Sequence, residues 1–249
     1  MYVPKNIEGT KVYHYDINSL YPYAMKTFKY PTNFVAYFKG DVSNMPEYNK
    51  MYKDCVGFYK VKVTSPKDIT HPLLPVKINN SSVYAEGTWT GWYYSEELNN
   101  AVKYGYSYEI LEGYLFNSDE IFAGYVDRMY KMKEESQKDS PGYVISKLLM
   151  NSLYGRFGMK RSMVNHEIVK QKNVNSFIDK IGFENLVNKL DIGNKTIISY
   201  KLQFQHTPKI NLAISAAITA NARIVLSQFK NNPQYQLFVW VILFKRDYN

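Results

Sequence analysis

The sequence predicts an α+β fold, and three observations lead to this prediction. Residues 11–17 alternate β-branched and aromatic side chains with polar ones, a pattern that is typical of a strand. Residues 37–114 contain short apolar runs separated by prolines and glycines, which indicates several strands and turns. Residues 118–154 and 210–229 place apolar side chains at helical spacing instead. We therefore expect an antiparallel sheet joined to helices.

The first expected strand ends at Asp16, and a turn and a helix start follow at residues 18–22. Within 37–114 we expect one helix, from Ser95 to Tyr104, with Ser95 as its N-terminal cap. The breaks between the surrounding strands fall at Pro66, Pro72, Pro75, Gly87, Gly91 and Gly105. This part of the chain is predicted to be an inserted β-rich subdomain.

Two helices hinged at a turn are expected next. The first runs from Ser118 to Lys138, the pair Pro141-Gly142 interrupts the pattern, and the second runs from Tyr143 to about Tyr154. Residues 160–206 are polar, with short strands expected only around 195–204. A buried helix over 210–229 and a last apolar strand complete the expected elements.

Size and composition favour a folded protein, and its positive charge is compatible with a polyanionic partner. The 249 residues are 45% hydrophobic and 16% aromatic, enough to bury a sizeable core. The net charge of +9 suits nucleic acid, although many basic proteins bind none. The single cysteine, Cys55, excludes an internal disulfide and a cysteine-built zinc site. We therefore expect a reducing compartment.

The sequence carries no recognisable targeting segment. Residues 1–10 lack the apolar run of a signal peptide and the Arg-rich pattern of a transit peptide. The longest uninterrupted apolar run that we find, Leu237–Phe244, is too short to span a bilayer, so no membrane partner is expected. Lys, Asn, Tyr and Ile have AT-rich codons, and their abundance suggests an AT-rich genome such as that of a mitochondrion or a phage.

The first candidate site surrounds Asp16, which we expect between a strand and a helix. A carboxylate at that place is held rigidly and can reach a metal ion. Ser19, Leu20 and Tyr21 follow at the helix N-terminus, where backbone N–H groups can hold a triphosphate, with Tyr21 beside the sugar. The alternative is that Asp16 only caps the helix or forms the turn, as aspartate commonly does.

The second candidate site lies on the helix after Pro141. Lys147, Asn151 and Tyr154 are spaced i, i+4 and i+7 and share one helix face. A cation, an amide and a ring in one row can contact the phosphate, base edge and base face of one nucleotide. Gly155 would let another backbone approach closely. The alternative is a solvated helix face with Gly155 as its C-terminal cap.

The third candidate site is the end of the sequence Thr219-Ala-Asn-Ala-Arg223 on the apolar helix. An arginine that emerges from an otherwise buried helix can clamp a phosphate, or it can extend to solvent without any ligand. This motif alone does not distinguish the two.

Taken in order, the three motifs resemble those of the protein-primed family B DNA polymerases of phages and of fungal mitochondrial linear plasmids. The first motif reads Asp16-Ile-Asn-Ser-Leu-Tyr-Pro22, the second Lys147-Leu-Leu-Met-Asn-Ser-Leu-Tyr-Gly155, and the third Thr219-Ala-Asn-Ala-Arg223. The resemblance implies part of the palm and of the helical fingers. It also implies a β-rich insertion like the family's first terminal-protein region.

The resemblance assigns a role to each motif residue. Asp16 and the backbone carbonyl of Ile17 would bind catalytic Mg²⁺. The nucleotide-binding residues would be Ser19, Leu20, Tyr21, Lys147, Asn151 and Tyr154. The DNA-binding residues would be Ser152, Gly155, Thr219 and Arg223. Tyr21 would exclude ribonucleotides by crowding the 2′ position, and Lys147 would contact the incoming triphosphate.

The resemblance also implies a division of the chain. The expected parts are the palm with the first motif (1–36), the β-rich insertion (37–115), the fingers helices (116–159), a second insertion (160–206), and a palm helix with a truncated final strand (207–249). The expected partners are template and primer DNA, deoxynucleoside triphosphates and a terminal protein as primer. The expected location is a mitochondrion, with a phage or bacterial cytoplasm as the alternative.

The chain departs from the family where its third catalytic motif, Tyr-x-Asp-Thr-Asp-Ser, should follow the Thr219 helix. The sequence there reads Leu-Phe-Val-Trp-Val-Ile-Leu-Phe over residues 237–244, with only Asp247 acidic beyond it. Two-metal phosphoryl transfer needs carboxylates from two segments. Codons for Val241–Leu243 can encode Asp-Thr in another frame, so we hypothesise a frameshift near Phe238. We expect a fragment that lacks the exonuclease, the third motif and the thumb.

Three functions are therefore open. The first is template-directed addition of deoxynucleotides in protein-primed DNA replication. The second is an inactive remnant that keeps only DNA and nucleotide contacts, which the missing aspartate favours for this chain. The third is a Tyr-rich binding module centred on Trp89, Trp92, Tyr93 and Tyr94, which is weaker because aromatics in short strands usually pack in a core.

Overall fold

The fold is α+β, as predicted, and the chain divides into two compact units. The computed structural model describes residues 15–41, 54–79, 81–159, 164–201 and 210–234. Unit 1 comprises Met1–Tyr154 and Leu212–Asn249, and unit 2 comprises Gly155–Asn211. The described residues form antiparallel sheets and six α-helices.

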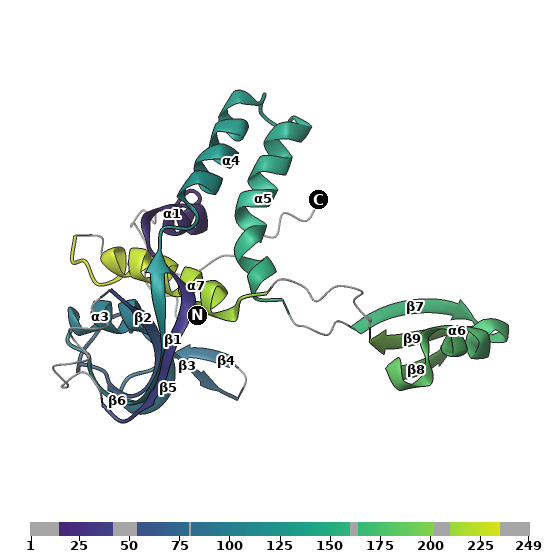
Figure 1. Ribbon diagram of the computed structural model, residues 1–249, viewed down its shortest axis with the longest axis horizontal. Helices are drawn as coiled ribbons and strands as arrows, with labels where there is room; N and C mark the ends of the chain where they lie inside the picture. The colour runs from purple at the N-terminus through teal and green to yellow at the C-terminus, as the bar shows by residue number, and fades with distance from the viewer. Residues whose placement is uncertain (1–14, 42–53, 80, 160–163, 202–209, 235–249) are drawn as a thin grey trace, which may run out of the picture. The chain divides into compact units, whose positions relative to one another are not determined.

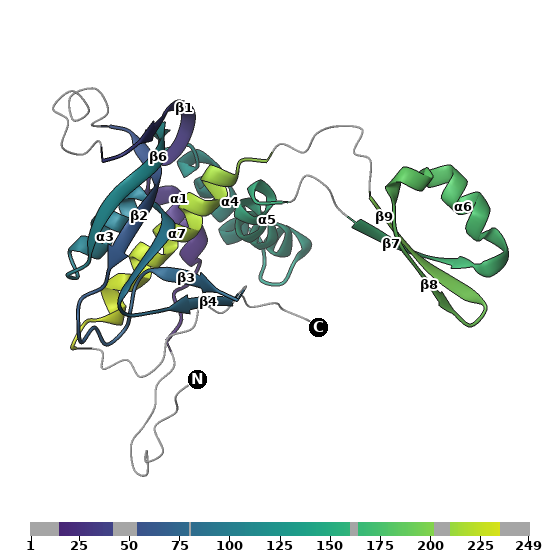
Figure 2. The same ribbon diagram turned by 90° about the horizontal axis from the view of Figure 1, so that it is seen from below.

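Unit 1 is built around a four-stranded antiparallel sheet in the order β1-β6-β2-β5. The strands are β1 (Tyr30–Lys39), β2 (Val56–Thr64), β5 (Thr88–Tyr94) and β6 (Ser107–Asp119). A separate hairpin consists of β3 (Pro75–Ile78) and β4 (Ser81–Tyr84). Figures 1 and 2 show the hairpin beside the larger sheet.

The alternation of side chains in β2 explains why the sheet has one buried face. Tyr59, Val61 and Val63 point into the core, while Lys60 and Lys62 lie on the opposite face. Helix α3 (Ser95–Val102) covers the buried face through Leu98 and Ala101. We call the face with Lys60 and Lys62 the outer face.

Four further helices belong to unit 1 in whole or in large part. They are α1 (Leu20–Thr27), α4 (Ala123–Glu135), α5 (Pro141–Phe157) and α7 (Leu212–Lys230). Helices α4 and α5 run side by side (Figures 1 and 2), and the Tyr125 hydroxyl of α4 donates to the Leu149 carbonyl of α5 at 3.1 Å. By length and composition α7 is apolar enough to cross a membrane, but Ala217, Ile218 and Ala222 are buried within unit 1.

Unit 2 is a three-stranded antiparallel sheet with one helix. Its elements are β7 (Val164–Lys170), α6 (Val174–Ile181), β8 (Leu186–Ile192) and β9 (Lys195–Lys201), with the strand order β7-β9-β8. The two-residue turn between β8 and β9 begins with Gly193, whose φ of 58° favours glycine. Only β9 falls where strands were expected; β7, β8 and α6 were not predicted.

Several expected elements differ in the structure. Residues 15–17 belong to no strand, and the rest of the first expected strand, like the whole apolar segment 237–244, lies outside the described residues. Residues 107–119 form one long strand, so α4 begins only at Ala123. Pro141 does not interrupt a helix but begins α5, where its missing N–H is not needed. Strand β1 continues through the boundary that we placed between residues 36 and 37.

The predicted serine cap of α3 is wrong. Tyr94 occupies the N-cap position, and Ser95 is the first residue of the helix. The Ser95 hydroxyl oxygen instead accepts the backbone N–H of Gly57 on β2 at 3.0 Å. The side chain thus ties α3 to the sheet because a buried N–H of a strand needs an acceptor.

Candidate functional site

The first motif forms the beginning of α1. Ser19 adopts the left-handed conformation at φ 55° and starts the helix, and its carbonyl accepts the N–H of Tyr23 at 2.9 Å. The Ser19 side chain makes no capping hydrogen bond. A ligand oxygen could therefore cap this helix in its place.

The structure brings the first and second motifs into direct contact. The rings of Tyr21 on α1 and Tyr154 on α5 are stacked, with centroids 4.3 Å apart and planes within 7°. Burial, followed by the neighbouring Tyr154, raises the pKa of Tyr21 to about 12, although Arg223 acts in the opposite direction. Both phenols therefore stay neutral at physiological pH.

The other residues of the second motif lie on the solvent side of α5. Lys147, Asn151 and Ser152 are exposed, while the Tyr154 carbonyl accepts the hydroxyl of Ser215 on α7 at 3.0 Å. Lys147 and Asn151 are thus accessible to a ligand on the face that they share with Tyr154.

Gly155 has neither of the two structural roles considered for it. Helix α5 continues to Phe157, so Gly155 is not its C-terminal cap. A Cβ added at Gly155 would meet no described atom within 4 Å, so within the described part of the chain no backbone approaches it closely. The open space beside Gly155 is available to a ligand.

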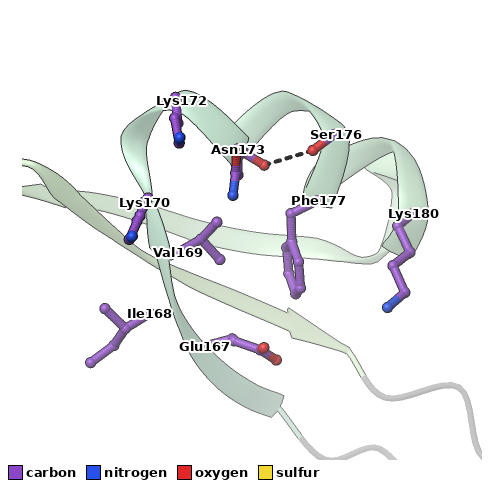
Figure 3. Close-up of a pocket in the computed structure, with 9 residues that line it drawn as sticks. All are labelled: Glu167, Ile168, Val169, Lys170, Lys172, Asn173, Ser176, Phe177 and Lys180. Atoms are coloured by element: carbon purple, nitrogen blue, oxygen red, sulfur yellow. Dashed lines mark hydrogen bonds between the residues drawn. The ribbon is translucent and has the colours of Figure 1, made fainter.

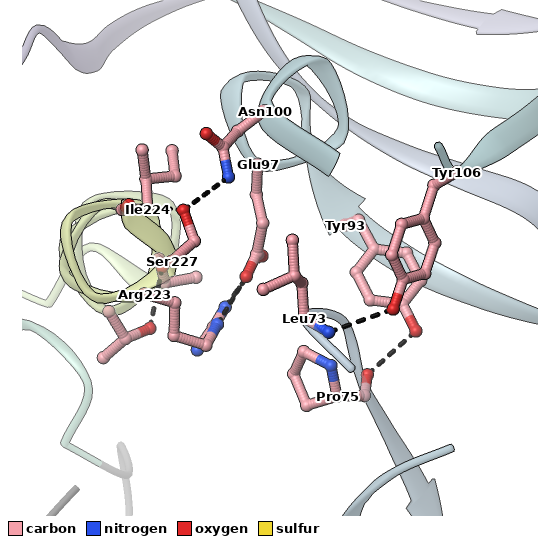
Figure 4. A network of polar contacts seen from close by, with 11 residues as sticks. Leu73, Pro75, Tyr93, Glu97, Asn100, Tyr106, Arg223, Ile224 and Ser227 are labelled. Atoms are coloured by element: carbon pink, nitrogen blue, oxygen red, sulfur yellow. Dashed lines mark hydrogen bonds and ion pairs between the residues drawn. The ribbon is translucent and has the colours of Figure 1, made fainter. Parts of the chain in front are cut away.

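The third motif makes internal contacts. Arg223 forms a bidentate ion pair with Glu97 of α3, with Nε–Oε1 and Nη2–Oε2 distances of 2.5 and 2.8 Å (Figure 4). Glu97 is buried, and the Thr219 hydroxyl donates to the Ala216 carbonyl at 2.8 Å. Glu97 was not predicted, although a glutamate beside Leu98 on the apolar face of α3 was a signal for it.

Two more groups surround this ion pair. The ammonium of Lys230 lies 4.6 Å from the centre of the Tyr84 ring, a cation–π contact. Burial and then the nearby Arg223 lower the pKa of Lys230 to about 7, although Glu97 raises it. Burial likewise raises the pKa of Tyr84. The α3–α7 contact thus holds charged groups inside unit 1.

Comparison with known proteins assigns the family. The family described as DNA polymerase type B, organellar and viral, matches residues 2–235. This chain belongs to that family. The resemblance to the protein-primed family B polymerases is therefore confirmed, and the apolar segment 237–244 lies beyond the matched residues.

The curated relatives that this chain matches are fungal and much longer. A probable DNA polymerase of Neurospora intermedia is 40% identical over 228 residues, which are 89% of this chain and 23% of the relative. One of Ascobolus immersus is 36% identical over 234 residues, which are 89% of this chain and 18% of the relative. This chain therefore spans about a fifth of the length of these relatives.

A solved structure shares the fold of this chain. Phi29 DNA polymerase, complexed with primer-template DNA and incoming nucleotide substrates, superposes with a TM-score of 0.58 at 17% identity. The superposition covers 86% of this chain and 35% of phi29 polymerase. At this identity the match shows the fold alone.

Family B polymerases use Mg²⁺, and Asp16 and the Ile17 carbonyl are the groups that would hold it here. Asp16 is exposed and Ile17 is half-buried in the segment before α1. Within the described ranges no three His, Cys, Asp or Glu side chains gather as a metal site. One carboxylate and one backbone carbonyl do not fit a centre that holds two ions through carboxylates from two segments.

A cavity of about 530 Å³ lies in unit 2 and contains none of the predicted site residues. Figure 3 shows it between β7 and α6, with three lysines among its lining side chains. These are Lys170, Lys172 and Lys180. The second insertion thus carries a basic cleft that was not predicted.

Proposed function

We propose that this chain is the nucleotide-handling part of a DNA-directed DNA polymerase that adds deoxynucleotides in protein-primed replication. The observation that carries the proposal is the stack of Tyr21 on Tyr154. Two motifs far apart in the sequence meet through two flat rings. Flat aromatic faces suit the sugar and base of a nucleotide, and exposed Lys147 and Asn151 suit its phosphate and base edge.

In this proposal each side chain acts through its own chemistry. Tyr21 lies beside the sugar and excludes a 2′ hydroxyl by its bulk, and Tyr154 and Asn151 contact the nascent base pair. Lys147 binds the triphosphate as a point charge, while Ser19, Leu20 and the start of α1 offer backbone N–H groups to it. Ser152 and the open space at Gly155 face DNA.

The geometry favours a different role for the third motif from the one that the resemblance implies. Arg223 already binds Glu97 through two nitrogens. The Thr219 hydroxyl donates its hydrogen bond to the Ala216 carbonyl. A phosphate contact needs a donor. We therefore propose that Arg223 fixes α7 against α3 and so positions the helix beside Tyr21, rather than holding the primer strand.

The experiment that tests the proposal measures binding and chemistry separately. A primer-template with a dideoxy end is titrated with dATP or ATP, and retention of the labelled nucleotide is measured for the wild type, Tyr21→Val and Tyr21→Phe. We expect Tyr21→Val to admit ATP and Tyr21→Phe to exclude it as the wild type does. Equal preference in all three proteins would refute the assignment of Tyr21.

Primer extension then distinguishes the active polymerase from the second candidate, a remnant that only binds. The donor set favours the remnant unless another segment supplies a carboxylate. Extension that is lost in Asp16→Asn supports the polymerase, and nucleotide retention without extension supports the remnant. Sequencing the transcript across residues 237–249 in all frames tests the proposed frameshift: an Asp-Thr-Asp in a neighbouring frame supports it.

Location and priming partner remain parts of the proposal. The family is organellar and viral and the relatives are fungal, which supports a mitochondrial site over a phage or bacterial cytoplasm. Fractionation of the source cells tests this assignment. A terminal protein is the proposed primer, which a covalent protein–DNA product at replication ends would support.

A further inference from the structure

The outer face of the unit 1 sheet carries a cluster of exposed aromatic rings. Exposed fractions are 60% for Phe34, 42% for Tyr37, 47% for Trp92 and 41% for Tyr114, so these rings are not core residues. They come from β1, β5 and β6, on the side of the sheet opposite α3. A soluble protein that keeps large rings together at its surface usually uses them for binding.

The rings are arranged in contact with one another. The Trp92 ring reaches across β2 and stacks on Tyr114, with centroids 5.6 Å apart and planes 29° apart. The Tyr37 ring, on the neighbouring strand β1, has its centroid 5.0 Å from that of Tyr114. Phe34 lies 6.5 Å from Tyr114. The register places Tyr114 opposite Tyr37 on β1 and opposite Phe58 on β2. The cluster therefore extends across the sheet.

Lysines alternate with these rings on the same face. Lys60 on β2 lies opposite Trp92 on β5. Lys62 on β2 and Lys39 on β1 are exposed. Glu112 binds both Lys60, at 2.9 Å, and the Tyr37 hydroxyl, at 2.6 Å, and Glu109 lies opposite Lys62. Apart from the buried Val56 at the start of β2, the outward-facing side chains on β2 and β5 are aromatic, Lys or Thr.

We propose that this outer face binds single-stranded DNA, with unpaired bases stacked on Trp92 and Tyr114 and phosphates on Lys39 and Lys62. Rings provide stacking for any unpaired base, and lysines follow the phosphate backbone. A protein partner is less favoured because Lys is depleted at protein interfaces, whereas lysines beside exposed rings suit a strand that carries phosphates. Duplex DNA is excluded as the main ligand because its bases are stacked on one another, which leaves no base face free for Trp92 and Tyr114. The site is separate from the Tyr21–Tyr154 stack.

The test uses the full chain and a fluorescent oligothymidylate of about 12 nucleotides, within the range of such sites. We expect Trp92→Leu and Tyr114→Leu each to weaken binding about 10-fold, because stacking on one ring contributes that much. Trp92→Phe and Tyr114→Phe should bind like the wild type, because a ring remains. Tyr130→Leu removes a ring of similar exposure on α4 and is the matched control.

A crosslinking experiment on the wild type maps the binding site directly, so it does not depend on how well the variants fold. An oligonucleotide with 4-thiothymidine, crosslinked to the wild type by light, should label peptides that contain Trp92 or Tyr114. Labels only elsewhere, unchanged binding by the Leu variants, or equal competition by an abasic oligonucleotide would each overturn the proposal. The proposal would also be overturned if the Leu variants lost binding to a terminal protein but kept their binding to DNA.

Discussion

The two units of this chain differ in charge and in burial. Unit 2 has ten Lys and Arg against four Asp and Glu, a net charge of +6 out of the chain's +9, although it is the smaller unit. Unit 1 has 21 basic residues against 18 acidic ones. Most of the electrostatic attraction for a polyanion therefore belongs to the second insertion, and the motif residues belong mostly to the nearly balanced unit.

Unit 1, which is the less charged unit, has the larger hydrophobic core. Unit 1 contains a cluster of buried side chains that joins the sheet to α3. Among the described residues of unit 2, the buried hydrophobic side chains are Val174 and Ile198. Few buried apolar contacts mean low local stability. We infer that buried side chains stabilise unit 1, whereas unit 2 has a small core and a strongly basic composition.

The largest expected effect concerns the buried ion pair of unit 1. The Arg223 side chain is only 20% exposed, and Glu97→Ala removes its partner. The unpaired buried charge should lower the free energy of unfolding by about 3–5 kcal/mol. Asp127→Ala breaks the exposed pair with Lys26 and should cost at most about 1 kcal/mol. Urea unfolding measures both. Equal losses would show that the α3–α7 contact is not a buried anchor.

The second prediction concerns the small core of unit 2. Ile198 is fully buried in the central strand β9, so Ile198→Ala should cost about 2–5 kcal/mol, enough to unfold that unit alone. Ile192→Ala removes an exposed side chain of the same type and is the control. Hydrogen exchange should accelerate in β7, β8 and β9 but not in α7. Faster exchange in α7 would mean that the two units unfold together.

The sequence allowed the family, the α+β class and the approximate positions of four of the unit 1 helices to be predicted. Local signals were sufficient there: α7 repeats small apolar side chains at helical spacing, and motifs such as Asp16–Pro22 are contiguous. The Tyr21–Tyr154 stack follows from two such motifs, but only the fold brings them face to face.

What failed depended on contacts between distant segments. Ser95 looked like a helix cap, but its hydroxyl accepts an N–H from β2, a partner that no local pattern reveals. No local pattern reveals Glu97 on α3 as the ion-pair partner of Arg223 either. Strands β7 and β8 of unit 2 were missed because most of their positions are exposed, so the alternation of polar and apolar residues was weak.

The third prediction is a pH dependence that arises inside unit 1. Lys230 has a pKa near 7 in the folded chain, against about 10.4 when unfolded, so between these values the unfolded state binds more protons. Stability should therefore rise from about pH 7 to about pH 9.5, by at most about 1.4 kcal/mol per pH unit. Above about pH 10 the raised tyrosine pKa values reverse the trend, because unfolded phenols ionise first.

Lys230→Met isolates this effect from the other titrating groups. The variant should show a smaller slope below pH 9.5 and a higher stability at pH 7, because the cost of a buried ammonium is removed. Urea unfolding at several pH values measures the slope. Lys103→Met, an exposed lysine of the same unit, should leave the slope unchanged. A slope that persists in Lys230→Met would assign the pH dependence to other groups.

The smallest expected effect concerns the basic cleft of unit 2 and tests the charge comparison directly. Replacing Lys170, Lys172 and Lys180 together with Ala should change the slope of log Kd against log salt for a DNA duplex by about 1 to 3 in magnitude. Each lysine that neutralises a phosphate releases condensed counterions, so its loss flattens the salt dependence whatever the DNA sequence.

The matched control for the cleft comes from unit 1. Lys67, Lys77 and Lys103 are exposed lysines, and replacing all three with Ala removes the same charge from the balanced unit. A duplex probe avoids the outer face of the sheet, which needs unpaired bases. If both triple variants flatten the slope equally, only total charge matters and the cleft is no phosphate site. If the unit 2 variant alone flattens it, the second insertion supplies the attraction that brings DNA to the motif residues.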